Sequence, residues 1–194
     1  MSAGATVGAP RPRPWLSNEL LGTLYFLGAE AMFFLGLVFV ALSLRRQSGA
    51  WPPAGSPPAD LGLLALNTAV LLASGVTMLA ARRAVARADG GGLVRWLAVT
   101  VTLGAAFLAG QVAAFARLGG WRPAEGMYRT LFDVVSGLHG LHVLAGLVLL
   151  GVVLGRARLG QFSGGRHVAV VAAAWYWTFV AAVWLVLLAA LVLG

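Results

Sequence analysis

Five long apolar runs alternate with short polar connections along the chain. Each run is long enough to cross the hydrocarbon core of a bilayer as a helix, which takes roughly 20 residues. The first connection carries repeated prolines, which cannot continue a helix. The pattern predicts an all-α fold, with a tail over residues 1–19 and a single transmembrane domain over residues 20–194. Its five helices are expected at about 20–44, 61–81, 96–116, 134–155 and 168–193.

Composition agrees with a membrane protein. Of the 194 residues, 60% are hydrophobic and only 10% are charged, whereas a soluble domain has roughly 25% charged residues. The net charge is +8, and every basic residue other than histidine is arginine. Because the arginines gather between apolar runs, they indicate membrane topology and not nucleic-acid binding. Cysteine is absent, which excludes disulfides, thiolate metal centres and haem attached through CxxCH.

Arginine is divided unevenly between the two sides of the predicted membrane domain. The positive-inside rule places the richer side in the cytoplasm. We therefore expect a cytoplasmic N-terminus and a C-terminus outside. The richer side holds Arg11, Arg13, Arg82, Arg83, Arg87, Arg95, Arg156, Arg158 and Arg166, and the other holds Arg45, Arg46, Arg117, Arg122 and Arg129.

Each apolar run carries small or polar residues at helical spacing. Residues three, four or seven apart share one face of a helix, and such faces let transmembrane helices approach and hydrogen-bond. We expect one bundle with these faces inside and Leu, Val and Ala facing lipid. The inward residues are Glu30, Asn67, Ser74, Thr77, Gly104, Gln111, Ser136, His139, Gly146, Trp177, Ala181 and Trp184.

Glu30 is the only charged residue between Glu19 and Arg45, and it falls near the middle of the first span. A carboxylate there costs at least a few kcal/mol unless it has a partner or a proton. Three interpretations stay open. Glu30 is a neutral, protonated acid, or it is paired structurally with His139 or His142 of a neighbouring helix, or it is a proton-relay or ion site.

His139 and His142 lie one turn apart in SGLHGLHVLAGL and could both face a metal. The remaining histidine, His167, lies in a connection, and a di-iron site needs several carboxylates inside the bundle. Because no ligand set is complete, we expect no metal, no cofactor and no catalytic residue in this chain. Both histidines are interpreted as hydrogen-bonding groups of the bundle. The tryptophans of the last run are interpreted as packing or lipid contacts: Trp175, Trp177 and Trp184.

Five segments occur in the order found in subunit III of the haem–copper oxidases, the third core subunit of cytochrome c oxidase. They are AEAMFF, ALNTAVLLASGVT, FLAGQ, FDVVSGLHGLHVLAGL and AWYWTFVAAVWL. The chain thus resembles this family over about residues 20 to 190, in a five-helix form that lacks the first two helices of longer members. Glu30 matches the family's buried acid, which is associated with carbodiimide labelling. His139 and His142 match its paired histidines, and Asn67 and Gln111 match polar positions.

The resemblance implies a non-redox subunit of an aerobic respiratory oxidase in the bacterial plasma membrane. Haem and copper are then expected in partner subunits, and the partners are oxidase subunits I and II. The chain is expected to bind phospholipid, to stabilise subunit I and to assist proton uptake, with cytochrome c as substrate of the complex. The last helix departs from the family: Thr178 stands where a histidine is usual, and Ala181 where an aspartate is usual.

Other functions remain as alternatives. Quinol oxidases and nitric oxide reductase have related subunits, which the sequence does not separate from the cytochrome c branch. A different class is a small proton-coupled transporter that uses Glu30. A factor for haem or copper insertion is disfavoured, because cysteine is absent and methionine is scarce.

Overall fold

The computed structural model describes residues 17–47, 61–117, 126–162 and 167–190. Within these ranges the chain forms five α-helices and no strand, and all five helices are long and apolar enough to cross a membrane. This confirms the predicted all-α, multi-pass fold. The helices are α1 (Asn18–Gln47), α2 (Leu61–Ala86), α3 (Gly90–Arg117), α4 (Met127–Arg158) and α5 (Val168–Leu188).

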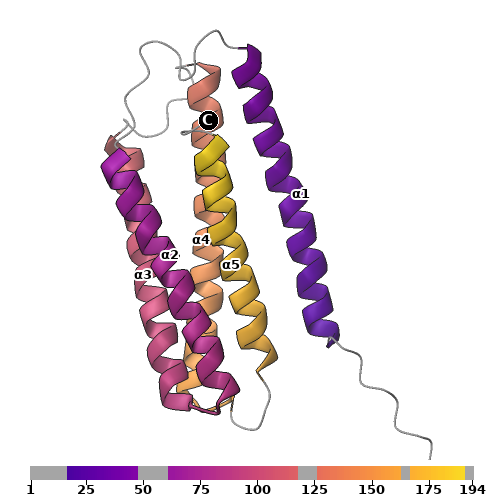
Figure 1. The fold of residues 1–194 in the computed structure, drawn as a ribbon, viewed down its shortest axis with the longest axis vertical. Helices are drawn as coiled ribbons and strands as arrows, with labels where there is room; N and C mark the ends of the chain where they lie inside the picture. Colours follow the sequence, from indigo (N-terminus) through magenta and orange to yellow (C-terminus); the bar gives the residue numbers. More distant parts are fainter. Residues whose placement is uncertain (1–16, 48–60, 118–125, 163–166, 191–194) are drawn as a thin grey trace, which may run out of the picture.

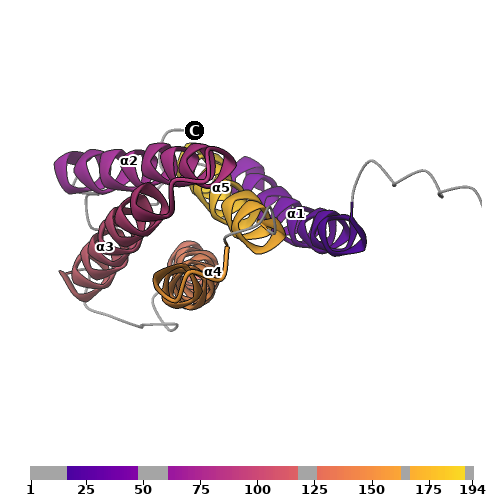
Figure 2. The same ribbon diagram turned by 90° about the horizontal axis from the view of Figure 1, so that it is seen from below.

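The helices stand side by side, and successive helices run in opposite directions (Figure 1). Helices α2 and α3 form a tight hairpin in which the Asp89 carboxylate accepts a hydrogen bond of 2.7 Å from the Gly92 N–H and so caps the start of α3. Seen from one end, α1 lies at the edge of the bundle, next to α5 (Figure 2). It packs mainly on α5 and contacts α4 more sparsely.

The observed helices mostly run past the apolar stretches that predicted them. Helix α4 begins at Met127, seven residues before the predicted start at 134, and therefore includes Arg129 and Asp133. These two charged side chains are buried and form an ion pair of 2.9 Å across one turn. Pairing offsets much of the cost of burying each charge, so the helix continues through a segment that reads as a connection. Most of the predicted tail, residues 1–16, lies outside the described residues.

Trp177 lies at the centre of the core and is fully buried. Its indole is held between Gly104 of α3 and Gly146 of α4. A Cβ atom at Gly104 would lie 2.7 Å from the ring, and one at Gly146 would lie 3.0 Å from it. Glycine at both positions therefore allows three helices to close around one tryptophan.

Hydrogen bonds between helices follow the predicted polar faces. Asn67 donates to the Gln111 side chain at 3.0 Å and to the Phe107 carbonyl at 3.2 Å, which joins α2 to α3. The Trp177 indole N–H donates to Ser74 at 3.0 Å, and the Trp184 N–H donates to Thr68 at 3.0 Å, so both join α5 to α2. Each such bond inside a membrane bundle contributes about 0.6 kcal/mol on average.

Candidate functional site

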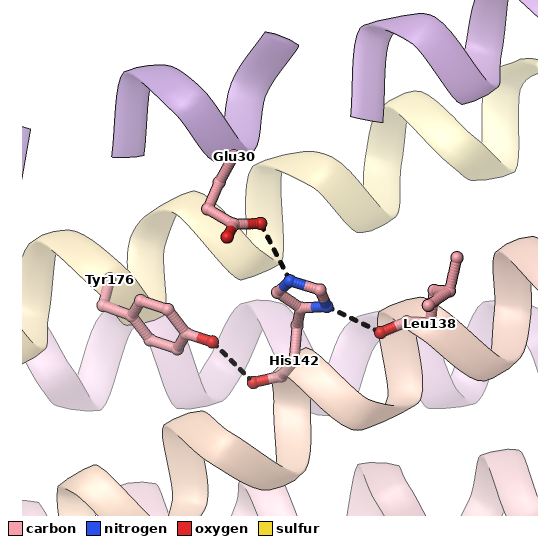
Figure 3. Close-up of polar contacts among 4 residues, drawn as sticks. All are labelled: Glu30, Leu138, His142 and Tyr176. Carbon is pink, nitrogen blue, oxygen red and sulfur yellow. Dashed lines mark hydrogen bonds and ion pairs between the residues drawn. The ribbon is translucent and has the colours of Figure 1, made fainter. Parts of the chain in front are cut away.

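Glu30 of α1 meets His142 of α4 across the seam between these helices. The Glu30 Oε2 atom lies 2.9 Å from the His142 Nε2 atom. Figure 3 shows the carboxyl group pointing directly at the imidazole edge. Of the two histidines that the sequence offered as partners, the structure thus selects His142.

Two further contacts fix His142. Its Nδ1 atom lies 2.7 Å from the carbonyl oxygen of Leu138, one turn earlier in α4. The Tyr176 hydroxyl of α5 donates a hydrogen bond of 3.0 Å to the backbone carbonyl of His142 (Figure 3). Phe33 stacks on the imidazole with the ring centres 6.4 Å apart, and Phe34 packs against it in a T-shaped arrangement at 4.9 Å. The imidazole is therefore held in one orientation, in largely apolar surroundings.

The Glu30–His142 pair lies at the side of the bundle and not on its axis. The Glu30 side chain is 22% exposed and the His142 side chain is 18% exposed. Helix α1 buries little of its surface, since only 11% of its most apolar window is inside the bundle. The pair therefore opens toward the surroundings of the α1–α4 seam, which in a membrane are lipid or a neighbouring subunit.

His139 lies one turn from His142 but in a different environment. It is 1% exposed, and neither ring nitrogen has a hydrogen-bond partner within the described part of the chain. Its neighbours are aromatic: Trp184 stacks on it at 5.4 Å, and Phe34 and Phe107 approach edge-on at 6.3 Å. The paired histidines of the sequence are thus one surface-facing, hydrogen-bonded group and one core group.

The other candidate residues lie at packing and hydrogen-bonding positions of the bundle. Asn67 and Gln111 bind each other within the α2–α3 hairpin. Trp177 and Trp184 are buried hydrogen-bond donors, and Trp175 is half-buried. Of the two positions that depart from the family pattern, Ala181 is buried and Thr178 is exposed.

Three residues that form buried or site-supporting contacts in the structure were not predicted from the sequence. Arg129 was assigned to a connection, and Asp133 was not singled out, although their spacing of four residues is the one that pairs charges on a helix. Tyr176 was also missed, because nothing in its sequence neighbourhood shows that its hydroxyl reaches the turn of α4 that carries His142.

A cavity of about 760 Å³ opens at the end of the bundle where α1 and α5 begin and α4 ends. Its polar groups come from Glu19, Arg156 and Gln161, and its other walls are apolar. The Arg156 guanidinium donates a hydrogen bond of 3.0 Å to Gln161 and lies 5.7 Å from the centre of the Phe162 ring. The lining residues are Glu19, Arg156, Gln161, Phe162, Val168, Ala169 and Ala172.

No group of three or more metal-ligating side chains occurs among the residues that the structure describes. The five apolar helices define the class of protein, which is a multi-pass helical membrane protein. The Glu30–His142 pair adds a polar contact at the side of its bundle. The family model for cytochrome c oxidase subunit III matches residues 17–193. The chain belongs to the cytochrome c oxidase subunit III family, a subunit of an oxidoreductase complex.

Individual relatives agree with this assignment. The chain is 38% identical over 170 residues to cytochrome c oxidase subunit 3 of Synechocystis, covering 87% of this chain and 72% of that protein. It is 39% identical over 172 residues to the subunit of the carp Cyprinus carpio and 37% identical over 172 residues to that of Gallus gallus. Each of these two alignments covers 86% of this chain and 66% of the relative. The resemblance found in the sequence is thus confirmed.

Proposed function

We propose that this chain is the metal-free third core subunit of an aerobic respiratory cytochrome c oxidase in a bacterial plasma membrane. It packs against oxidase subunits I and II, which hold the haem and copper and take electrons from cytochrome c. It stabilises subunit I, binds phospholipid and assists proton uptake. The observation that carries the proposal is the family match over residues 17–193 together with the Glu30–His142 pair in the wall of the bundle.

The N-terminus of the chain lies in the cytoplasm in this proposal. Six exposed or half-exposed arginines of the described residues lie at the end where α1, α3 and α5 begin: Arg82, Arg83, Arg87, Arg95, Arg156 and Arg158. The opposite end has Arg45, Arg46, Arg117 and Arg129, of which Arg129 is neutralised by Asp133. The larger uncompensated positive charge supports a cytoplasmic location of the first end.

The cavity beside Arg156 supports the phospholipid part of the proposal. An arginine at the membrane edge offers a charged donor for a phosphate headgroup, and the apolar walls next to it suit the upper part of an acyl chain. A volume of about 760 Å³ is in the range of small-molecule sites, roughly 300–1,000 Å³. No carboxylate forms an ion pair with Arg156 within the described residues, so its guanidinium remains available to an anion.

The position of Glu30 supports the proton-uptake part of the proposal. Glu30 lies twelve residues after the start of α1 at Asn18, which is about 18 Å along the helix axis. It is thus nearer to the proposed cytoplasmic end of α1 than to the other end. An intramembrane carboxyl group is expensive and is commonly functional.

Co-purification tests the subunit assignment. The tagged chain is expressed in its host, extracted in mild detergent with lipid, and its partners are measured by an optical redox difference spectrum. We expect haem and copper absorbance with oxygen consumption driven by reduced cytochrome c. Activity with quinol alone, or with nitric oxide, would assign the complex to a different branch. A colourless chain that remains alone, and that carries protons across liposomes by itself, would refute the oxidase assignment in favour of a transporter.

Three substitutions test the roles of the two sites. Arg156→Gln should reduce the phospholipid retained by the purified complex, whereas Arg158→Gln, an exposed arginine outside the cavity, should not. Glu30→Gln should leave assembly intact and change proton uptake or the number of turnovers before inactivation. Normal proton uptake and durability in Glu30→Gln would leave Glu30 a packing residue only.

A further inference from the structure

The hydrogen bonds around His142 restrict where its protons can be. A carbonyl oxygen only accepts hydrogen bonds, so the 2.7 Å contact between Nδ1 and the Leu138 oxygen requires a proton on Nδ1. The Nε2 atom then carries a lone pair if the imidazole is neutral, or a second proton if it is an imidazolium. Its partner at 2.9 Å, Oε2 of Glu30, must supply or receive the proton between them.

Four combinations of the two groups can be compared. A carboxylate facing a neutral imidazole places lone pair against lone pair and leaves a net negative charge. A carboxylic acid facing an imidazolium leaves a net positive charge. Both of these combinations carry a net charge, which is costly within a membrane span. The two remaining combinations, acid with neutral imidazole and carboxylate with imidazolium, each contain one proton in the gap and have no net charge.

The surroundings favour the acid with the neutral imidazole. Phe33 and Phe34 lie against the His142 ring, and separating full charges among such groups carries a large desolvation penalty. The other titratable groups close by are Tyr176 and His139. The Tyr176 hydroxyl is engaged with the His142 carbonyl, and His139 faces aromatic rings one turn away.

We propose that Glu30 and His142 hold one proton between them, with Glu30 as the donor and His142 locked as the Nδ1–H tautomer by the Leu138 carbonyl. The proton can shift from Oε2 to Nε2, breaking an O–H bond and forming an N–H bond with no change in net charge. It cannot continue through the ring, because release of the Nδ1 proton leads only to a carbonyl oxygen. His142 is therefore a terminus of proton movement and not a relay, and protons enter and leave through Glu30.

Solid-state NMR of the full chain in lipid bilayers, with ¹⁵N-labelled histidine, tests this inference. The chain has only three histidines, so His142 is assigned by the signal lost in His142→Asn. We expect a protonated Nδ1 and an unprotonated, hydrogen-bonded Nε2. In Glu30→Gln the tautomer should persist, because an amide N–H can still donate to Nε2. In Glu30→Leu the Nε2 signal should shift toward that of a nitrogen without a donor, while Nδ1 stays protonated.

Other results would overturn the inference. A bare Nδ1 would show that the Leu138 carbonyl does not fix the tautomer, and protonation of both nitrogens would show that His142 and not Glu30 holds the proton. Tyr176→Phe is the control, since Tyr176 contacts the backbone of His142 and not its ring, so the tautomer should be unchanged. The inference deepens the proton-uptake part of the proposed function, but this readout needs no oxidase activity, so the two fail separately.

Discussion

Substituting Gly104 with alanine tests whether close approach around Trp177 holds the bundle together. The new Cβ would lie 2.7 Å from two atoms of the indole and 2.8 Å from a terminal methyl of Leu147. The Leu147 methyl can rotate away. The indole cannot, because Gly146 of α4 is close on another part of the ring and Ser74 holds its N–H at 3.0 Å.

The size of the effect follows from these distances. Carbon atoms in contact prefer about 3.5 Å or more, so the ring must move by roughly 0.8 Å. Such overpacking costs about 1–3 kcal/mol. A displacement of that size also stretches the Trp177–Ser74 hydrogen bond beyond useful length, at a cost of about 0.6 kcal/mol. We therefore expect Gly104→Ala to lower the free energy of unfolding by about 2–4 kcal/mol.

The assay is unfolding of the purified chain in mixed micelles by a denaturing detergent, followed by circular dichroism. Gly151→Ala is the matched control. It is an exposed glycine within α4 whose Cβ would meet nothing within 4 Å, so its stability should be unchanged or raised by up to about 1 kcal/mol through helix propensity. If Gly104→Ala and Gly151→Ala are equally stable, the close packing around Trp177 does not hold the bundle together.

Three further predictions use the same assay. Asp133→Leu should lower the free energy of unfolding by about 3–5 kcal/mol, because the buried Arg129 loses the carboxylate that it pairs with. Adding Arg129→Met should restore most of this loss; a double variant as unstable as the single one would contradict this. The free energy of unfolding of His139→Leu should stay within about 1 kcal/mol of the parent value. Leucine loses the aromatic stacking of the imidazole but also removes two buried nitrogens that have no hydrogen-bond partner within the described residues, so the two effects offset each other. A loss well above about 2 kcal/mol would show that His139 has a hydrogen-bond partner. A double-mutant cycle of Asn67→Ala and Gln111→Ala should give a coupling of about 0.6 kcal/mol, and additive effects would show that their 3.0 Å contact contributes nothing.

The sequence identifies Glu30 and its two possible partners, but it does not show which of them Glu30 binds. An isolated acid in an apolar run identifies Glu30 as a residue that needs a partner. His139 and His142 are equally good partners by spacing, since three residues place them only about 60° apart around a helix. The choice of His142 depends on where α1 lies against α4, and that is set by long-range packing such as the contact of Phe34 with both histidines.

The ends of the helices are also only partly predictable from the sequence. The sequence places Arg129 outside the membrane because a lone arginine avoids hydrocarbon. In the structure α4 includes it, because Asp133 pairs with it and both side chains are buried. The spacing of four residues indicates that Arg129 and Asp133 can pair, but the burial of both side chains is visible only in the folded bundle.

The apolar runs alone are enough to predict five membrane-crossing helices, because the length and apolarity of each run decide spanning without reference to any other part of the chain. Its motifs also determined the family. That His142 binds Glu30 while His139 lies in an aromatic core is visible only in the packed bundle. The physical reason is that a helix fixes the directions of its own side chains, but the identity of the group that each one meets depends on how separate helices pack.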